Sequence, residues 1–207
     1  MEGSAIGPRM RYACGVMLPG AIALPTLTTS RLRLRALVPT DVPALYAIFG
    51  DVEVVRYWSA PPLTDLAGAA ALQAEIHALF QARTLLQWGI VRADEDTVLG
   101  TCTLAEIDLQ HQRAAIGFAL GRASWGQGFA REAVQALVDF AFTELELRRL
   151  AADADPRNLR SLHLLESLGF AREGFQRECY FVMDEWQDAV LVGLLRREWQ
   201  ALRDKHR

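Results

Sequence analysis

Residues 125–130 combine two closely spaced glycines with the start of an apolar helical pattern, a combination that could bind an anion. Gly126 and Gly128 would let the backbone approach a ligand closely. A helix start also presents unpaired N–H groups with a partial positive charge. Residues 125–128 contain no Ser, Thr, Asp or Asn to cap those groups. The pattern therefore predicts an anion or phosphate cradle here.

A plain glycine turn into a helix is the alternative for the same residues. The dinucleotide fingerprint fails because Arg131 stands at its third glycine position, and no Gly-Lys-Ser/Thr sequence exists for a nucleotide-triphosphate loop. The motif alone does not choose between the turn and the cradle.

Asn158, Ser161 and Leu165 form a second candidate cluster. Their spacing of three and seven residues places them on one face of a predicted helix. Asn and Ser near a helix start are also ordinary local capping groups. Their combination with the glycine segment favours a ligand site.

Strands and helices of a mixed domain are predicted around these two segments. Alternating apolar residues predict a strand over 31–37, and helical spacing predicts a helix over 42–49, capped by Asp41, and another over 66–80, capped by Thr64 or Asp65. An antiparallel meander follows over 86–91, 98–109 and 114–120. Next come a helix ending near residue 144, a strand over 150–154, a helix starting at Asp155-Pro156 and closed by Gly169, strands over 171–182 and 186–193, and a charged C-terminal helix.

This order predicts one α/β (α+β) domain with a mixed, mostly antiparallel twisted sheet and helices on both faces. We expect the domain to cover residues 27–201, with a disordered leader over 1–26 and a tail over 202–207. An early start codon, with Met10 or Met17 as the true start, would explain the leader equally well, and a signal peptide is the weaker alternative.

Composition limits the classes of protein that the chain could belong to. Of its 207 residues 51% are hydrophobic and 23% charged, which supports a globular core. Lys+Arg 22 against Asp+Glu 25 gives a net charge of -3, so the basic surface of a nucleic-acid binder is missing. Three cysteines without metal-ligand spacing favour a reducing cytoplasm and no metal site. Every apolar run is too short to span a membrane.

Several segments along the chain resemble one known family. Residues 125–133 read Trp-Gly-Gln-Gly-Phe-Ala-Arg-Glu-Ala, and Asp155-Pro-Arg-Asn-x-x-Ser161 and Leu168-Gly-Phe170 follow. With the opening residues 29–35, the Ile-Gly-Phe of 116–118 and the closing 173–177, Asp188 and 198–199, the chain resembles the GNAT superfamily of acyl-CoA-dependent N-acetyltransferases over about residues 28–199. Within it, the resemblance is to the RimJ/RimL-like branch.

The resemblance implies acetyl-CoA as the acyl donor, with no metal. The family's pyrophosphate loop falls on residues 125–130, although Trp125 stands where the pattern prefers Gln or Arg. Asn158 matches the asparagine that contacts the pantetheine arm, and the strand edge near Phe118 would pair with pantetheine amides. The implied CoA-binding residues are Phe118, Ala119, Leu120, Arg122, Trp125, Gly126, Gln127, Gly128, Phe129, Ala130, Arg131, Asn158 and Ser161.

The implied reaction is direct attack of a primary amine on the thioester, which needs an acid and a base. Leu165 replaces the family's tyrosine acid, so Ser161 is the candidate acid. Ala115 replaces the family's glutamate base, so Glu106 and Asp108 are the candidate bases, acting through water. An exposed role on a strand face is the alternative for both carboxylates.

Four further side chains are weaker candidates. His111 and His163 could serve as the base instead, and Arg177 and Tyr180 could line the acceptor cleft.

The amine acceptor stays open at this level. A protein N-terminal α-amine is one candidate, and a small amine such as an amino acid, polyamine or antibiotic is another. The aromatic and basic segment 54–64 argues against a polycationic aminoglycoside. A non-catalytic acyl-CoA sensor is the alternative from another class. We expect a monomer or homodimer.

Overall fold

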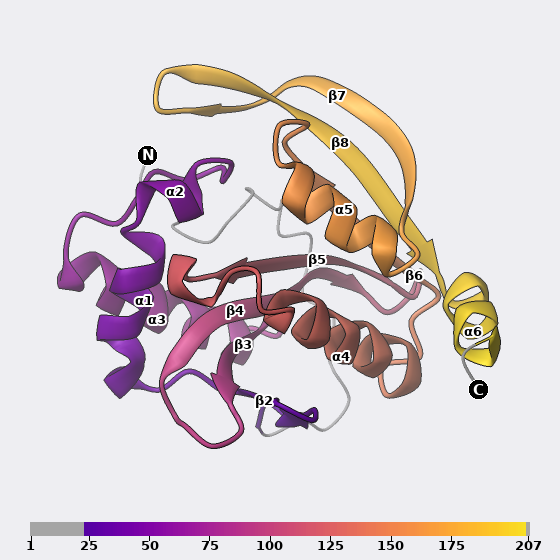
Figure 1. Cartoon of the computed structure of the whole chain (residues 1–207), viewed down its shortest axis with the longest axis horizontal. Coiled ribbons are helices and arrows are strands. Elements are labelled where there is room, and N and C mark those ends of the chain that lie inside the picture. Colours follow the sequence, from indigo (N-terminus) through magenta and orange to yellow (C-terminus); the bar gives the residue numbers. More distant parts are fainter. Residues whose placement is uncertain (1–22, 206–207) are drawn as a thin grey trace.

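One eight-stranded sheet organises the chain, with helices on both of its faces (Figure 1). The computed structural model describes residues 23–205. The strands are β1 (Leu27–Thr28), β2 (Leu32–Arg35), β3 (Leu85–Arg92), β4 (Val98–Asp108), β5 (Arg113–Leu120), β6 (Arg149–Ala154), β7 (Ala171–Val182) and β8 (Glu185–Leu195). The helices are α1 (Val42–Phe49), α2 (Val52–Val55), α3 (Leu66–Gln81), α4 (Phe129–Thr143), α5 (Leu159–Ser167) and α6 (Arg196–Lys205), with 3-10 turns at Pro39–Asp41 and Arg122–Ser124.

The sheet order is β1-β2-β3-β4-β5-β6-β8-β7, and β5 with β6 is its one parallel pair. This pair is short. It joins Arg113 to Arg149, Ala114 to Leu150 and Ala115 to Ala151, and then ends. Strand β5 continues to Leu120 while still paired with β4 on its other side. From Ile116 onward, β5 therefore has one edge that β6 does not cover.

Alternation along the strands sends side chains into two separate cores. On one face, Leu104, Ile116 and Leu150 pack with α4. On the other face, Ala105 and Ala119 pack with α1 and α3. These two cores fix both faces of the sheet around the gap between β5 and β6.

The long β7–β8 hairpin arches over the sheet, above α5 in the view of Figure 1. It is joined to the sheet through β8, which pairs antiparallel with β6 from Arg149–Leu195 to Ala154–Val190. The hairpin thereby brings β7 residues close to the end of β6.

The predicted architecture is confirmed, as are the helices and strands apart from their ends. One predicted cap is wrong and another is right in position only. Asp155 does not cap α5, because Asn158 is the N-cap and its side chain accepts from the Ser161 N–H. Asp41 is the N-cap residue of α1 as predicted, but its carboxylate makes no cap bond and accepts instead from the Val38 N–H and from Arg35.

The expected leader and tail overlap with ordered structure at their inner ends. Residues 1–22 lie outside the described residues. Leu24 packs against the α4-side core, and the Trp88 indole donates to the Pro25 carbonyl at 2.7 Å. At the other end, α6 continues to Lys205, beyond the expected boundary at residue 201.

Candidate functional site

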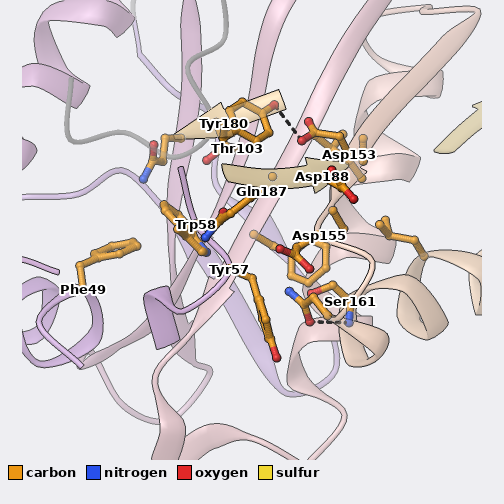
Figure 2. Close-up of a pocket in the computed structure, with 18 of the residues that line it drawn as sticks. Phe49, Tyr57, Trp58, Thr103, Asp153, Asp155, Ser161, Tyr180, Gln187 and Asp188 are labelled. Carbon is orange, nitrogen blue, oxygen red and sulfur yellow. Dashed lines mark hydrogen bonds between the residues drawn. The ribbon is translucent and has the colours of Figure 1, made fainter. Parts of the chain in front are cut away.

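A pocket lies where β5 and β6 separate, and it is lined from both faces of the sheet (Figure 2). Ile116, Phe118, Asn158, Ser161 and Leu165 line its α4–α5 side. Its other side is lined by polar and aromatic residues, chiefly Phe49, Tyr57, Trp58, Gln87, Thr103, Asp153 and Tyr180. The gap in the sheet thus joins two differently built walls in one pocket.

The uncovered edge of β5 can pair with an extended ligand. The Gly121 N–H donates to the Leu99 carbonyl beside β5, so alternation turns the backbone groups of Leu120 and Phe118 the opposite way, toward the pocket. The Leu120 carbonyl accepts a hydrogen bond from the Trp125 indole N–H at 2.7 Å. Phe118 keeps its backbone groups on this edge, where a peptide-like arm can add as a strand. Ala119 faces β4 instead and packs its side chain in the α1–α3 core.

The segment 125–130 forms a concave turn at the start of α4. Gly126 and Gly128 have φ of 74° and 77°, a left-handed conformation that side-chain-bearing residues rarely adopt. Gly128 is the N-cap of α4 and provides no side-chain cap. The first-turn N–H groups of Phe129, Ala130 and Arg131 therefore point toward the turn without an intrahelical partner, which suits an anion.

The turn is held from behind by residues 29–31. Arg31 donates from Nη1 to the Gln127 carbonyl at 3.0 Å, and from Nε to Glu132 at 2.6 Å. Glu132 also accepts from the Thr29 hydroxyl at 2.6 Å and the Arg31 N–H at 2.9 Å. Burial would raise the pKa of Glu132, but the hydrogen bonds from Thr29, Arg31 and Ser30 outweigh burial and hold it below its ordinary value.

We expect Glu132→Gln to destabilise the protein by about 1–3 kcal/mol, because one carboxylate holds several donors of the N-terminal segment. The folded-state pKa of Glu132 is lowered, so its contribution is present above the unfolded value and is lost as pH falls through the folded value. Thermal unfolding across pH checks this: the difference between wild type and variant should shrink in acid. A difference that does not depend on pH would contradict the ionic role.

Arginines surround the turn. Arg131 donates to the Ser167 carbonyl at 3.3 Å, and Arg122 is exposed. Arg160, which the sequence reasoning missed, lies over the Trp125 ring at 5.0 Å. The signal that could have found Arg160 is its place in the sequence, between Asn158 and Ser161 at the start of the same predicted helix. The three guanidinium groups give the turn a positive charge that the net charge of the chain does not reveal.

Asn158 and Ser161 come together at the start of α5, as the helical spacing predicts. The Asn158 Oδ1 accepts from the Ser161 N–H at 3.2 Å, which leaves the Asn158 NH₂ group for the pocket. Ser161 lines the same pocket, and so does Asp155; both are labelled in Figure 2.

The two carboxylates favoured by the sequence lie outside the pocket lining. Asp108 accepts from the N–H and the ring of His111, and these bonds lower its pKa. Glu106 lies partly exposed at a bulge of β4 with φ of 49°, where its partial burial and the charge of Asp153 raise its pKa. Arg177 borders a different hollow, on β7, and His163 is exposed. Tyr180 does line the pocket.

Three other carboxylates line the pocket: Asp153, Asp155 and Asp188. Asp155 is buried and held by Arg157, through its N–H at 2.8 Å and its guanidinium at 2.7 Å. Asp188 accepts from the Glu178 N–H at 2.9 Å. Asp153 accepts from the Tyr180 hydroxyl at 2.9 Å, drawn as a dashed line in Figure 2. Burial raises the pKa of Asp153, against the opposing effect of the Tyr180 bond.

Sequence reasoning missed Asp153 and its polar neighbours. The signal was present, because Gln87, Thr103 and Asp153 are polar residues inside otherwise apolar strands. A buried polar residue in such a strand indicates a special role.

Two classes of feature are absent from the described part of the chain. Residues 23–205 contain no group of three or more His, Cys, Asp or Glu side chains placed to hold a metal ion. No helix within the same range is long and apolar enough to cross a membrane.

Comparison with known proteins gives consistent matches. Residues 31–171 match the family model described as acetyltransferase (GNAT) domain. The chain is 38% identical over 174 residues to the uncharacterised N-acetyltransferase p20 of Bacillus licheniformis, covering 84% of this chain and 98% of that protein.

Two solved structures share the fold. One is an acetyltransferase of the GNAT family from Bacillus anthracis, with a TM-score of 0.75 and 22% identity, over 84% of this chain and 100% of that chain. The other is spermidine N-acetyltransferase from Vibrio cholerae in complex with CoA and spermine, with a TM-score of 0.74 and 24% identity, over 83% and 99% of the two chains.

Proposed function

The chain belongs to the GNAT family of acetyl-CoA-dependent N-acetyltransferases, and from this premise we propose that it acetylates a primary amine in the pocket between β5 and β6. The observation that carries the proposal is the pocket itself. It meets the uncovered edge of β5 on one side and a carboxylate- and aromatic-lined wall on the other. A donor and an acceptor can therefore reach one point from opposite faces of the sheet.

The α4–α5 side fits the donor. The uncapped first turn of α4, with Gly126 and Gly128 in left-handed conformation, would hold the CoA diphosphate through backbone N–H groups. Phe118 would pair with the pantetheine amides, and the Asn158 NH₂ would donate to them. When bound, acetyl-CoA supplies an activated thioester.

The chain's own groups would then orient the transfer. The Phe118 N–H points to the pocket, where it would donate to the thioester carbonyl oxygen and stabilise the charge that develops there. The Ser161 hydroxyl would supply a proton to the departing sulfur. Glu106 and Asp108, which lie outside the pocket lining, would need water molecules to reach it.

The acceptor side fits a cationic or hydrophobic amine. Tyr57 and Trp58 provide aromatic faces, which attract cations, and the pocket's carboxylates complement an ammonium group. Both a small amine and the extended N-terminus of a peptide could meet these conditions. The Vibrio cholerae neighbour, solved with spermine, makes polyamines a necessary part of any acceptor panel.

The proposal also includes an N-terminal α-amine as one acceptor, a cytoplasmic location, and a monomer or homodimer. The RimJ/RimL-like motifs support an N-terminal α-amine as one acceptor. The cysteines of the described residues, Cys102 and Cys179, are free, which agrees with a reducing cytoplasm. The proposal keeps a monomer or a homodimer as the oligomeric state.

A panel of acceptors tests the proposal. The purified protein is incubated with acetyl-CoA and, separately, amino acids, polyamines, aminoglycosides and peptides with free N-termini, and the acetylated products are identified by mass spectrometry. We expect acetylation of at least one primary amine. The N-acetylated form of the same amine, offered as a control substrate, should not react. A protein that binds acetyl-CoA and acetylates no amine would favour the sensor alternative.

A further inference from the structure

A row of polar groups crosses the apolar sheet and ends at the gap between β5 and β6. Gln87 of β3 is paired in register with Thr103 of β4, and Thr103 with Gly117 of β5. The parallel register of Ala115 with Ala151, extended by two residues, places Asp153 of β6 on the same row. All four residues line the pocket. Because paired residues project to the same face, the row faces α1 and α3, away from the CoA side.

Gly117 leaves the centre of this row open. Its missing side chain gives a small acceptor access to the edge of β5, next to Phe118, with Thr103 and Asp153 on either side. A Cβ added at Gly117 would meet only Thr103, at 3.9 Å, so close packing of the protein does not account for the glycine.

Gln87 has an unsatisfied group. It is only 5% exposed, and its Oε1 is buried without a hydrogen-bond partner among the described residues. A buried carbonyl oxygen left unpaired costs free energy, so such groups commonly receive a donor from a ligand or water. Gln87 lines the pocket, where an N–H donor of an acceptor would satisfy it.

Asp153 differs from the other two pocket carboxylates in its partners. Arg157 neutralises Asp155, and a backbone N–H holds Asp188. Within residues 23–205, no cation lies within ion-pair distance of Asp153, whose carboxylate accepts from the neutral Tyr180 hydroxyl and from a backbone N–H. No positive charge neutralises this carboxylate, so it can accept a proton from a ligand.

We propose that the row is the amine site of the enzyme: at Gly117, Asp153 accepts one proton of the acceptor's ammonium and Thr103 accepts another of its N–H groups. Neighbouring strands lie about 5 Å apart, so Gln87 on β3 is too far from Asp153 on β6 to share one nitrogen with it, and it accepts instead from a second N–H donor of the acceptor. The acceptor class that follows is a primary amine with a further N–H donor along its chain, because a simple monoamine would leave the Gln87 Oε1 unpaired. The inference rests on the proposed acetyltransferase function.

The proton balance is complete without any further reactant. One proton passes from the ammonium to the Asp153 carboxylate, and the freed electron pair forms the N–C bond at the thioester carbonyl. The C–S bond breaks, and the sulfur receives a second proton from the nitrogen through the Ser161 hydroxyl. The amide nitrogen keeps the third proton, and Asp153 returns its proton to water.

Several charged or titratable groups surround Asp153 and shape its pH dependence. Tyr180 of β7 donates to it, and burial raises the pKa of that tyrosine. Glu106 of β4 adds negative charge, itself offset by Arg113. Other groups facing the site are Tyr57, Asp155 just after β6, Asp188 of β8, and Cys179 beside Tyr180.

Asp153→Asn tests the inference. We expect kcat/KM for the amine to fall by about 10²–10⁴-fold and acetyl-CoA affinity to stay within about threefold, since Asp153 would act in proton transfer and not in donor binding. The acidic limb of the pH profile of kcat/KM should disappear, which a purely structural role would not cause. Asp153→Glu should recover part of the rate.

Stability separates chemistry from misfolding. The folded-state pKa of Asp153 is raised, so its ionised form destabilises the fold as pH rises through that value. Asp153→Asn should therefore match or exceed the wild-type melting temperature at neutral pH, with the advantage disappearing in acid. A folded variant with wild-type kcat/KM and an unchanged pH profile would overturn the inference while leaving the acetyltransferase function standing.

Glu106→Gln and Asp188→Asn are the rival arms of the same experiment. We expect much smaller losses in both. A loss in either that equals the loss in Asp153→Asn, with the acidic limb removed, would assign the proton to that carboxylate and overturn the proposal. A wild-type protein that acetylates no amine would overturn both the inference and the function it rests on.

Gln87→Leu tests the other end of the row. We expect KM for the amine to rise by about tenfold with acetyl-CoA affinity unchanged, because the oxygen that accepts the second N–H donor of the acceptor is lost. The melting temperature should rise or stay constant, since a buried unpaired oxygen is removed. Unchanged KM with a folded variant would remove Gln87 from the amine site.

Discussion

Gly128→Glu should weaken acetyl-CoA binding by at least about 100-fold, which corresponds to roughly 2.8 kcal/mol. The substitution places a carboxylate at the N-cap of α4, where the account places the CoA diphosphate. Two like charges about 4 Å apart near a protein surface repel by about 4 kcal/mol before salt screening, so a 100-fold loss is a conservative expectation. Isothermal titration with acetyl-CoA measures it.

Gly128→Ala is the matched control. Gly128 has φ of 77°, so either substitution strains the backbone, at a cost of about 1–2 kcal/mol in stability. A Cβ built there meets only Arg31, at 3.4 Å, so the side chain itself fits. Gly128→Ala should lose stability but keep most of its affinity. A folded Gly128→Glu protein with wild-type affinity would contradict the placement of the diphosphate.

Ser161→Ala should lower kcat by roughly 10²-fold while leaving acetyl-CoA affinity nearly unchanged. A proton donor typically contributes about 10²–10⁴-fold, and a thiolate is already a fair leaving group, so the lower end applies. The variant keeps the backbone N–H of residue 161, which donates to the Asn158 side chain, so the N-terminus of α5 should stay folded. Single-turnover kinetics with a reactive amine measures the chemical step.

Ser167→Ala provides the control on the same helix. The Ser167 hydroxyl is exposed and donates to the Leu164 carbonyl at 2.7 Å, away from the pocket lining. It should leave kcat unchanged and report the general cost of such a change in α5. If Ser161→Ala and Ser167→Ala turned over at equal rates, Ser161 would not be the acid.

The donor side of the site could be predicted from sequence because its determinants are local. The turn at residues 125–130 depends on two glycines and a missing cap, and the pair Asn158 and Ser161 depends on helical spacing. Within this region the error was the cap of α5: Asp155-Pro156 has the composition of a helix start, yet Asp155 binds Arg157 and the helix begins three residues later.

The acceptor side could not be predicted because its determinants are not local. Gln87, Thr103 and Asp153 come from three strands, and only the register of β3, β4, β5 and β6 aligns them. Sequence favoured Glu106 and Asp108 for being carboxylates near the correct strand. A bulge between Ala105 and Asp108 breaks the alternation there, and neither residue lines the pocket.

In the proposed function, the separation of β5 from β6 lets one pocket meet both substrates. Sequence predicts the strands but gives no sign that their pairing ends at Ala115 and Ala151. With a full ladder the backbone groups of Phe118 would be paired within the sheet, and the two walls would be separated by it. The function therefore depends on a missing stretch of pairing as much as on particular side chains.

The most direct measurement of the central claim is a single mixture of protein, acetyl-CoA and a reactive primary amine, in which free CoA and acetylated amine are quantified together over time. We expect the two products to appear in equal amounts, over many turnovers, and neither to form with the protein omitted. Binding of acetyl-CoA that raises the melting temperature but yields neither product with any primary amine would contradict the acetyltransferase function.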